Sequence, residues 1–293
     1  MSKCLLVYYS QGGSTGRMAE TIAKGLRASD HAVDLHNLKD GPAPDPGRYD
    51  FLGVGTPAYY FRPPFIVTDH LQSLPDLSGK PFFVFIVYGA DLGDAGNVVR
   101  RALERKGGRE IGYNRYFGAE TFLGYLKRGY LYSPHHPKPD AIAQAELFGR
   151  ATAACLRSAE YRKPAYDGPT HAVYRVERSL INRLFVRQMY SRMFSVDRSK
   201  CTSCGLCAKL CPTRNISEDK DGRPVWGREC ILCFFCEMKC PKDAINSPVT
   251  WFLFRPFMIY NIWRTNRDPG VEVARVEHAG GRTRVISSQQ DKV

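Results

Sequence analysis

Eight of the ten cysteines fall into two copies of one spacing, C-x2-C-x2-C-x3-C-P. The first copy runs from Cys201 to Pro212 and the second from Cys230 to Pro241, with 18 residues between the two sets of cysteines. Each run offers three thiolates from one short loop and a fourth further along, which is the ligand pattern of [4Fe–4S] clusters. The spacing therefore predicts one-electron redox chemistry at two clusters.

Two other uses of these cysteines stay open on spacing alone. Pairs of C-x2-C also build Cys4 zinc sites, although such sites need neither the extra cysteine in the loop nor the proline after the fourth. Disulfides need an oxidising compartment, and the apolar run between Met1 and Tyr9 is too short for a secretory signal. Iron–sulfur is the leading interpretation, with a reducing, cytoplasmic location.

The double run resembles bacterial-type two-cluster ferredoxins, in which the fourth cysteine of each run ligates the other cluster. The resemblance implies a first cluster held by Cys201, Cys204, Cys207 and Cys240. It implies a second cluster held by Cys211, Cys230, Cys233 and Cys236. This crossed ligation would set the two clusters close together as a short electron relay.

The two cysteine loops differ in polarity. The first contains Gly205, whereas the second is filled by the apolar side chains of Ile231, Leu232, Phe234 and Phe235. A drier shell with fewer hydrogen bonds to sulfur lowers the potential of a cluster. We therefore expect the two clusters to differ in potential.

A strand, a loop and a helix open the chain. Leu5–Tyr9 is an apolar run, and apolar residues recur with helical spacing from Met18 to Leu26. The loop between them consists of Ser10, Gln11, Gly12, Gly13, Ser14 and Thr15. Its backbone N–H groups, its hydroxyls and the helix N-terminus form a phosphate cradle, although the loop matches neither G-x-x-x-x-G-K-[ST] nor G-x-G-x-x-G.

Strands and helices then alternate. The predicted strands after the first are 32–38, 49–55, 81–87 and 109–116, and the predicted helices include 95–106 and 141–157. Apolar strands interleaved with helices predict an α/β fold with a doubly wound, parallel, five-stranded sheet. In such sheets ligands bind beyond the carboxyl ends of the strands, at the switch point.

The first loop is similar to the phosphate loop of flavodoxins, and the loops after the third and fourth strands correspond to those that sandwich the flavin. The resemblance implies an FMN site whose remaining contacts come from these two loops, namely Thr56, Pro57, Ala58, Tyr59, Tyr60, Tyr88, Gly89 and Gly93. Tyr59, Tyr60 and Tyr88 are the candidates for stacking on the ring. The alternative is that these aromatic side chains simply pack the loops.

The whole chain resembles the flavodoxin–ferredoxin fusion proteins. We expect a flavodoxin-like FMN-binding domain over 1–160 and a linker with an amphipathic basic helix over 161–195. A small α+β ferredoxin-like domain with two [4Fe–4S] clusters is expected over 196–249, and an aromatic and basic tail over 250–293. The polar end, 278–293, is expected to fray.

The formal net charge is +13. Two clusters and one FMN, each contributing about −2, would leave about +7. No nucleic-acid-binding motif is present, so the charge favours an acidic redox partner or an anionic surface. Peripheral membrane contact is an alternative for two segments, 171–194 and 251–264, with a location on the inner face of the membrane.

Two functions fit these features. The first is an electron-transfer module that passes electrons between FMN and the clusters and serves a separate partner. The second is a self-contained oxidoreductase in which the segment 117–139, rich in tyrosine and histidine, covers a small substrate at the flavin. That segment could equally support the ferredoxin-like domain. No catalytic residue is assigned from the sequence.

Overall fold

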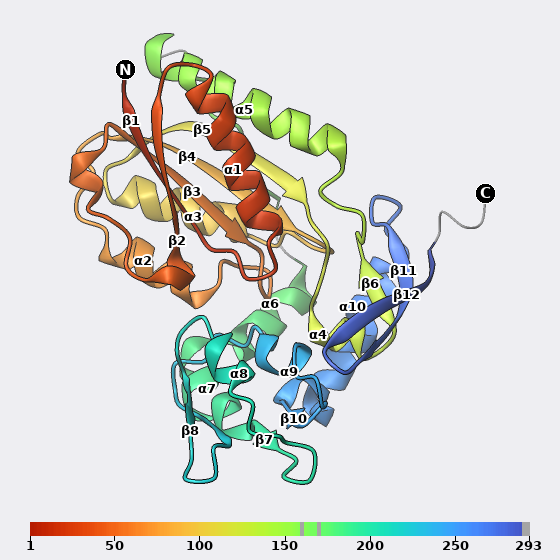
Figure 1. Cartoon of the computed structure of the whole chain (residues 1–293). Helices are drawn as coiled ribbons and strands as arrows, with labels where there is room; N and C mark the ends of the chain where they lie inside the picture. Colours follow the sequence, from red (N-terminus) through yellow and green to blue (C-terminus); the bar gives the residue numbers. More distant parts are fainter. Residues whose placement is uncertain (159–160, 169–170, 289–293) are drawn as a thin grey trace. The chain divides into compact units, whose positions relative to one another are not determined.

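A computed structural model describes residues 1–158, 161–168 and 171–288. The chain divides into two compact units (Figure 1). The first unit consists of Met1–Ala119 and His135–Tyr174, and the second of Glu120–Pro134 and Arg175–Val293. Each unit is therefore assembled from two separate stretches of the chain.

The first unit is built on a five-stranded parallel sheet with the strand order β2-β1-β3-β4-β5. The strands are β1 (Lys3–Tyr8), β2 (Ala32–Asn37), β3 (Phe51–Pro57), β4 (Pro81–Tyr88) and β5 (Arg109–Phe117). The interior residues of β1, β3 and β4 are almost continuously buried, as expected for parallel strands covered on both faces, whereas the edge strands β2 and β5 are only partly buried. This is the flavodoxin-like order, so the predicted α/β fold is confirmed.

Helices cover both faces of this sheet (Figure 1). They are α1 (Ser14–Arg27), α2 (Phe65–Ser73), α3 (Ala95–Arg105) and α5 (Pro139–Ser158). Helix α1 packs against α5, and its apolar side chains from Met18 to Leu26 are fully buried in the core. The apolar residues whose helical spacing predicted α1 are thus the residues that the helix buries.

One buried arginine fastens the segment 161–168 to the first unit. Arg100 of α3 forms a two-pronged ion pair with Glu110 of β5, with N–O distances of 2.8 and 3.0 Å. The same guanidinium donates to the carbonyls of Pro164 and Ala165 at 2.7 and 3.1 Å. Although its composition predicts a linker, this segment lies against α3 because Arg100 needs its carbonyls to satisfy the remaining N–H groups.

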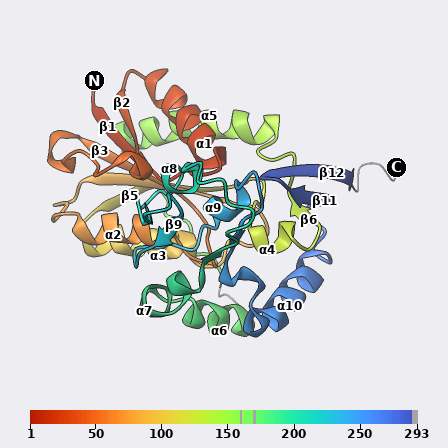
Figure 2. The ribbon, with the colours of Figure 1, turned by 60° about the horizontal axis from the view of Figure 1, so that its bottom comes forward.

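The second unit consists of short elements around the cysteine runs. They are β7 (Ser195–Val196), α8 (Leu206–Lys209), β8 (Ile216–Glu218), β9 (Pro224–Trp226), α9 (Phe235–Met238) and β10 (Ile245–Asn246). β7 pairs with β10 and β8 with β9, both antiparallel. Helices α8 and α9, which contain the third cysteine of each run, lie side by side (Figure 2). The α+β composition expected for the cluster region is present.

An insertion after β5 belongs to the second unit. It contains α4 (Leu123–Leu126) and β6 (Tyr130–Tyr132), and β6 pairs with β11 (Val273–Ala279). Strand β11 also pairs with β12 (Arg282–Ser288), which completes a three-stranded sheet. The expectation that 278–293 frays is therefore wrong up to Ser288, and 289–293 lie outside the described residues. The turn at Gly280 and Gly281, with φ of 57° and 72°, is the two-residue hairpin turn that sets this pairing.

The basic segment before the cysteine runs is not one helix. It forms α6 (Ala172–Leu180), α7 (Arg183–Gln188) and the 3₁₀ turn η3 (Tyr190–Met193). The break occurs because the Asn182 side chain accepts a hydrogen bond from the Phe185 N–H at 3.0 Å and so starts a new helix. The expectation of one amphipathic basic helix within 161–195 is therefore wrong, because the segment is divided into these three elements.

The C-terminal aromatic segment forms three further elements. They are η4 (Pro248–Thr250), η5 (Phe252–Phe254) and α10 (Arg255–Thr265). Among the residues that the structure describes, no helix is both long enough and apolar enough to cross a bilayer.

Candidate functional site

The first set of cysteines surrounds one cavity. The cavity has a volume of about 460 Å³, and its lining includes Cys201, Cys204, Cys207 and Cys240. Three of these come from the first run and the fourth from the end of the second run. The side chains of Glu218 and Lys242 also reach the lining, and Cys204 is exposed. The first site therefore reaches the protein surface at Cys204.

The second set surrounds another cavity, of about 320 Å³. Its lining includes Cys211, Cys230, Cys233 and Cys236. The rest of the lining is mostly apolar and includes Phe194, Ile231 and Phe234. The structure therefore brings the fourth cysteine of each run to the cavity of the other run.

The two cysteine runs have the same backbone, repeated after 29 residues. Ser203 and Leu232 have φ of 51° and 53°, and Gly205 and Phe234 have φ of 68° and 54°. The fourth cysteines are also equivalent, because Cys211 Sγ accepts a hydrogen bond from Asn215 N–H and Cys240 Sγ from Ala244 N–H, each at 3.3 Å. Left-handed turns hold backbone N–H groups around the sulfurs, as a thiolate-bound cluster requires.

Burial distinguishes the thiols of the second cavity. It raises the pKa of Cys230 and of Cys233 to about 12, and that of Cys236 well above its ordinary value. Thiolates in such surroundings are unfavourable unless cations stabilise them, and iron is the cation that a cysteine quartet of this kind binds. Among the described residues, no three His, Cys, Asp or Glu side chains gather closely enough to hold a single metal ion. Each quartet instead encloses a volume.

Trp226 is a residue of the second cavity that the spacing of cysteines does not reveal. Its indole N–H is buried, and its contact with Cys236 lowers the pKa of that thiol, against the effect of burial. A buried donor beside a thiol fits a sulfur-rich group in the cavity. The ring of Trp226 stacks on Phe194, with centroids 5.3 Å apart.

The loop between β1 and α1 has the features of an anion cradle. The Ser10 hydroxyl is buried and meets no hydrogen-bond partner, while Asn37 at the end of β2 fixes the Ser10 backbone with two bonds of 3.2 Å. Gly13 has φ of 100° with open space beside its Cα, and α1 begins at the next residue. Thr15 is buried in the first turn of α1. An FMN phosphate fits this loop because the orphaned hydroxyl and the helix N-terminus both favour an anion.

The loops after β3 and β4 interlock. Tyr60 and Phe61 both have positive φ, of 51° and 64°, in a tight turn closed by two backbone hydrogen bonds between Tyr59 and Arg62. Gly93 lies so close to Phe61 that a Cβ there would be 2.3 Å from the Phe61 carbonyl oxygen. The Asp94 N–H donates to that same oxygen at 3.0 Å. Two non-glycine residues in left-handed conformations mark a turn that tertiary contacts hold in place.

The remaining predicted flavin contacts lie in these two loops with different roles. The Thr56 hydroxyl is buried and donates to the Pro57 carbonyl at 3.0 Å, and the Ala58 N–H donates to Val87 of β4. Tyr59 meets Tyr9 edge-on, with centroids 6.1 Å apart. Tyr88 is the last residue of β4 and Gly89 follows it, and the Tyr88 ring packs on Phe117 with centroids 4.6 Å apart. Since the carboxyl ends of parallel strands meet at one edge, the three loops share that edge of the sheet.

The insertion 120–134 contacts the second cysteine site. Phe122 packs on Phe234, with centroids 5.8 Å apart, and the Lys127 ammonium pairs with Glu237 of α9. The Glu237 side chain is only 3% exposed. Of the two roles considered for 117–139, the contacts of its central part are those of a support for the cluster region. Neither Glu237 nor its lysine partner could be inferred from the cysteine motif.

The tyrosines of the insertion are also used in packing. Tyr125 and Tyr132 are buried and meet edge-on at 5.0 Å, and Tyr130 stacks on Tyr132 and lies under the Arg275 guanidinium. The Tyr132 hydroxyl donates to Asn266 at 3.1 Å, and burial raises the pKa of this phenol above its ordinary value.

Comparison with protein families identifies two domains in the chain. Residues 5–126 match a flavodoxin domain, and residues 194–217 match a 4Fe–4S binding domain that includes the first cysteine run. No curated protein matches the chain.

Solved structures similar to this chain include several flavodoxins. A flavodoxin from the domain Archaea is 17% identical and covers 53% of this chain and 99% of its own, with a TM-score of 0.41. Oxidised flavodoxin 1 from Bacillus cereus is 19% identical, and the match covers 52% of this chain and 98% of the flavodoxin, with a TM-score of 0.42. The rubredoxin oxygen:oxidoreductase of Desulfovibrio gigas is 18% identical, and the match covers 54% of this chain and 37% of the oxidoreductase, with a TM-score of 0.42.

Proposed function

Because the chain is a fusion of a flavodoxin domain and a 4Fe–4S ferredoxin domain, we propose that it carries one FMN in the first unit and two [4Fe–4S] clusters in the second, and that it delivers electrons to a separate redox partner. The two domain types support an electron-transfer role. Flavins exchange electrons in pairs or singly and clusters exchange one at a time, so the combination can join two-electron and one-electron reactions.

The observation that carries this proposal is the grouping of the eight cysteines. Two quartets, each taken from both runs, line two cavities within one compact unit. In the proposal, Cys201, Cys204, Cys207 and Cys240 hold the first cluster. Cys211, Cys230, Cys233 and Cys236 hold the second.

The residues of the first unit have the chemistry to bind FMN. Ser10, Ser14 and Thr15 supply hydroxyls and the start of α1 supplies N–H groups for the phosphate. Backbone from Thr56 to Tyr60 and from Tyr88 to Gly93, with Gln11 and Gly12, would surround the rest of the molecule. Gly93 lets the two ring-binding loops approach each other, which keeps them rigid before FMN binds.

A carrier function is favoured over a self-contained reductase by the contacts of the insertion. A reductase would need proton donors from 117–139 at a substrate. Tyr125, Tyr130 and Tyr132 are instead packed against one another and against β11 within the second unit. Because these three tyrosines are used in packing, the segment supports the ferredoxin-like unit, and the tyrosines are not placed to donate protons to a substrate.

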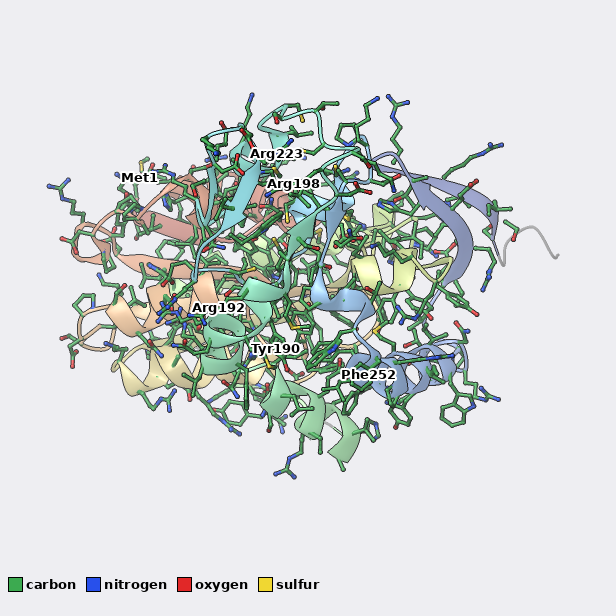
Figure 3. All side chains as sticks on the ribbon, turned by 90° about the horizontal axis from the view of Figure 1, so that it is seen from below. Met1, Tyr190, Arg192, Arg198, Arg223 and Phe252 are labelled. Atoms are coloured by element: carbon green, nitrogen blue, oxygen red, sulfur yellow. The ribbon has the colours of Figure 1, made fainter. Side chains whose placement is uncertain are left out.

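The partner that fits is an acidic redox protein. Cys204 is the exposed cysteine of the first site, and Lys242 lies on the rim of that cavity. Arg198 and Arg223 also belong to this part of the chain (Figure 3). Positive charge around an exposed redox centre steers an acidic protein to it and raises the association rate.

Anaerobic reconstitution with iron, sulfide and FMN tests the proposal. We expect about eight iron and eight sulfide per chain, together with one FMN. After reduction by dithionite, the protein should reduce an acidic flavodoxin or ferredoxin faster at low salt than at high salt. A content of four iron, zinc in place of iron, or the absence of bound FMN would contradict the assignment of cofactors. Transfer that does not respond to salt would contradict the acidic partner.

A further inference from the structure

The turn of the C-terminal hairpin lies against the segment that carries Cys240. This turn, at Gly280 and Gly281, joins β11 to β12, and the Gly280 N–H donates to the Asp243 carboxylate at 2.8 Å. A Cβ on Gly281 would lie 2.8 Å from the Lys239 carbonyl oxygen and 3.2 Å from that of Cys240. Figure 1 and Figure 2 both show this end of the hairpin beside α9. The turn therefore packs directly on the backbone around the fourth cysteine of the second run.

Among the cysteines around the first cavity, Cys240 depends most on support from outside its own loop. Cys201, Cys204 and Cys207 lie within one stretch of seven residues, so the local backbone fixes their spacing. Cys240 comes from the other run, and its position relative to that stretch depends on the contacts of the segment that carries it. Groups that contact a metal ligand orient it, and their loss weakens binding of the metal.

The crossing cysteine of the second site, Cys211, has support of a different kind. The Asn215 side chain, on the same segment, accepts a hydrogen bond from the Glu229 N–H at 2.6 Å and so ties the segment to the second run. The equivalent of Asn215 in the repeat is Ala244, whose methyl group can form no such bond. The hairpin provides a tether at the neighbouring position instead, because Asp243 accepts the hydrogen bond from the turn.

The hairpin is itself held by the rest of the second unit. Ala274 and Val276 of β11 are buried, and the backbone of β11 pairs with β6 of the insertion as well as with β12. The insertion also reaches α9, through the ion pair between Lys127 and Glu237. The turn thus projects from a three-stranded sheet and can hold in place the backbone that it contacts.

We propose that the β11–β12 hairpin positions Cys240 for the first cluster, with Gly281 as its backbone contact and Asp243 as its tether. The inference rests on the proposed function, in which Cys240 completes the first quartet. Any side chain at Gly281 would meet the Lys239 carbonyl oxygen more closely than van der Waals contact allows. Arg214, the equivalent of Asp243 in the first run, has no acceptor for such a bond. Gly281 and Asp243 are therefore positioning residues of the first site alone.

Alanine substitutions of the two turn glycines provide the test and its control. Both glycines have left-handed φ, so the backbone cost is similar, but a Cβ on Gly280 would lie 3.6 Å from the Pro241 carbonyl oxygen, an ordinary contact. In the reconstituted protein, Gly281→Ala should speed the loss of iron to a chelator about tenfold, because the overlap displaces the backbone around the ligand. Gly280→Ala should stay near the wild-type rate. The cluster that survives in Gly281→Ala should have the electron paramagnetic resonance spectrum of Cys204→Ser, which lacks a ligand of the first site.

Asp243 provides a second pair of variants that creates no overlap. Its φ is 47°, a conformation that glycine and asparagine both adopt. Asp243→Gly removes the acceptor and should also speed the loss of the first cluster, whereas Asp243→Asn keeps an acceptor oxygen and should resemble the wild type. If Gly281→Ala does not fold, this pair decides alone.

Three outcomes would overturn the proposal. They are equal rates of iron loss in Gly281→Ala and Gly280→Ala, equal rates in Asp243→Gly and Asp243→Asn, and loss of both clusters together in Gly281→Ala, which would indicate general destabilisation. A wild-type protein that binds only four iron atoms would instead refute the proposed function on which the inference rests. Neither readout requires electron transfer.

Discussion

The two cysteine sites share a backbone and differ in some of the side chains that line them. Both use left-handed turns at equivalent positions and an N–H bond to the fourth sulfur. The first cavity has Ser203, Glu218 and Lys242 in its lining and an exposed cysteine, whereas the second is lined by Phe194, Ile231 and Phe234. Because solvent and polar groups stabilise the more negative, reduced state of a cluster, the first site should have the more positive potential. The repeat therefore provides two sites that share one backbone geometry and should differ in the reduction potential of the cluster that each holds.

The difference also separates two tasks. A site with an exposed cysteine is suited to exchange electrons with a partner, and a site lined by aromatic rings, such as the second, is suited to store or relay them. The insertion 120–134 supports the second site through Phe122 and Lys127. Contact with a partner and protection from solvent are thus assigned to different copies of the same motif.

Serine substitutions of the cysteines should have the largest effect, because each removes a ligand and with it about four iron atoms per chain. Cys204→Ser and Cys240→Ser should leave the same surviving cluster, and Cys211→Ser should match Cys233→Ser. Iron analysis and electron paramagnetic resonance of the four reduced variants check this pairing. A spectrum of Cys240→Ser that matches Cys233→Ser would show that each run holds its own cluster.

The second-largest effect is expected for Lys127→Met. It leaves the buried Glu237 carboxylate without its cation, which should destabilise the second unit by up to about 3 kcal/mol. Arg223→Met is the control at the first site, because Arg223 pairs with the half-exposed Asp221 and should cost less than about 1 kcal/mol. Anaerobic guanidinium unfolding with iron release measures both. Equal losses would refute the special support of the second site by the insertion.

A smaller effect should follow from exchanging the shells of the two sites. Ser203 and Leu232 occupy equivalent positions with nearly equal, left-handed φ, so each residue would take a backbone conformation that the other already adopts. Leu232→Ser should raise the potential of the second cluster and Ser203→Leu should lower that of the first, each by less than about 60 mV, a tenfold change in a one-electron equilibrium. Potentiometric titration measures both shifts, and shifts of the opposite sign would contradict the role assigned to the shells.

The smallest effect concerns long-range charge. Lys242 and Thr213 are equivalent in the repeat and line the first and second cavities. Lys242→Thr should slow reduction of an acidic partner at low salt and have little effect at high salt, because exposed charges are screened there. Thr213→Lys should leave the rate nearly unchanged if electrons leave from the first site. Stopped-flow kinetics measures these rates, and a larger response to Thr213→Lys would reverse the assignment of the exit.

The sequence predicts the parts whose signals are local. The apolar strands, the helical spacing from Met18 to Leu26 and the cysteine spacing each act over a few residues, so the five-stranded parallel sheet and the two cysteine runs could be anticipated, while the crossed grouping came from the resemblance to two-cluster ferredoxins. Trp226, Asn37 and Glu237 could not, because each acts on a residue far away in the sequence. The insertion's attachment to β11 joins residues more than 130 positions apart, and no local pattern encodes that pairing. The hairpin at Gly280 and Gly281 is different, since alternating residues around two glycines are a readable signal.

The most direct test of the account is a redox titration of the reconstituted protein, followed by electron paramagnetic resonance and absorbance together. The account predicts two [4Fe–4S] signals with separate potentials, with the more positive one missing in both Cys204→Ser and Cys240→Ser, and a flavin that titrates in the same sample. A single cluster signal, or a more positive signal that survives in either of these variants, would contradict it.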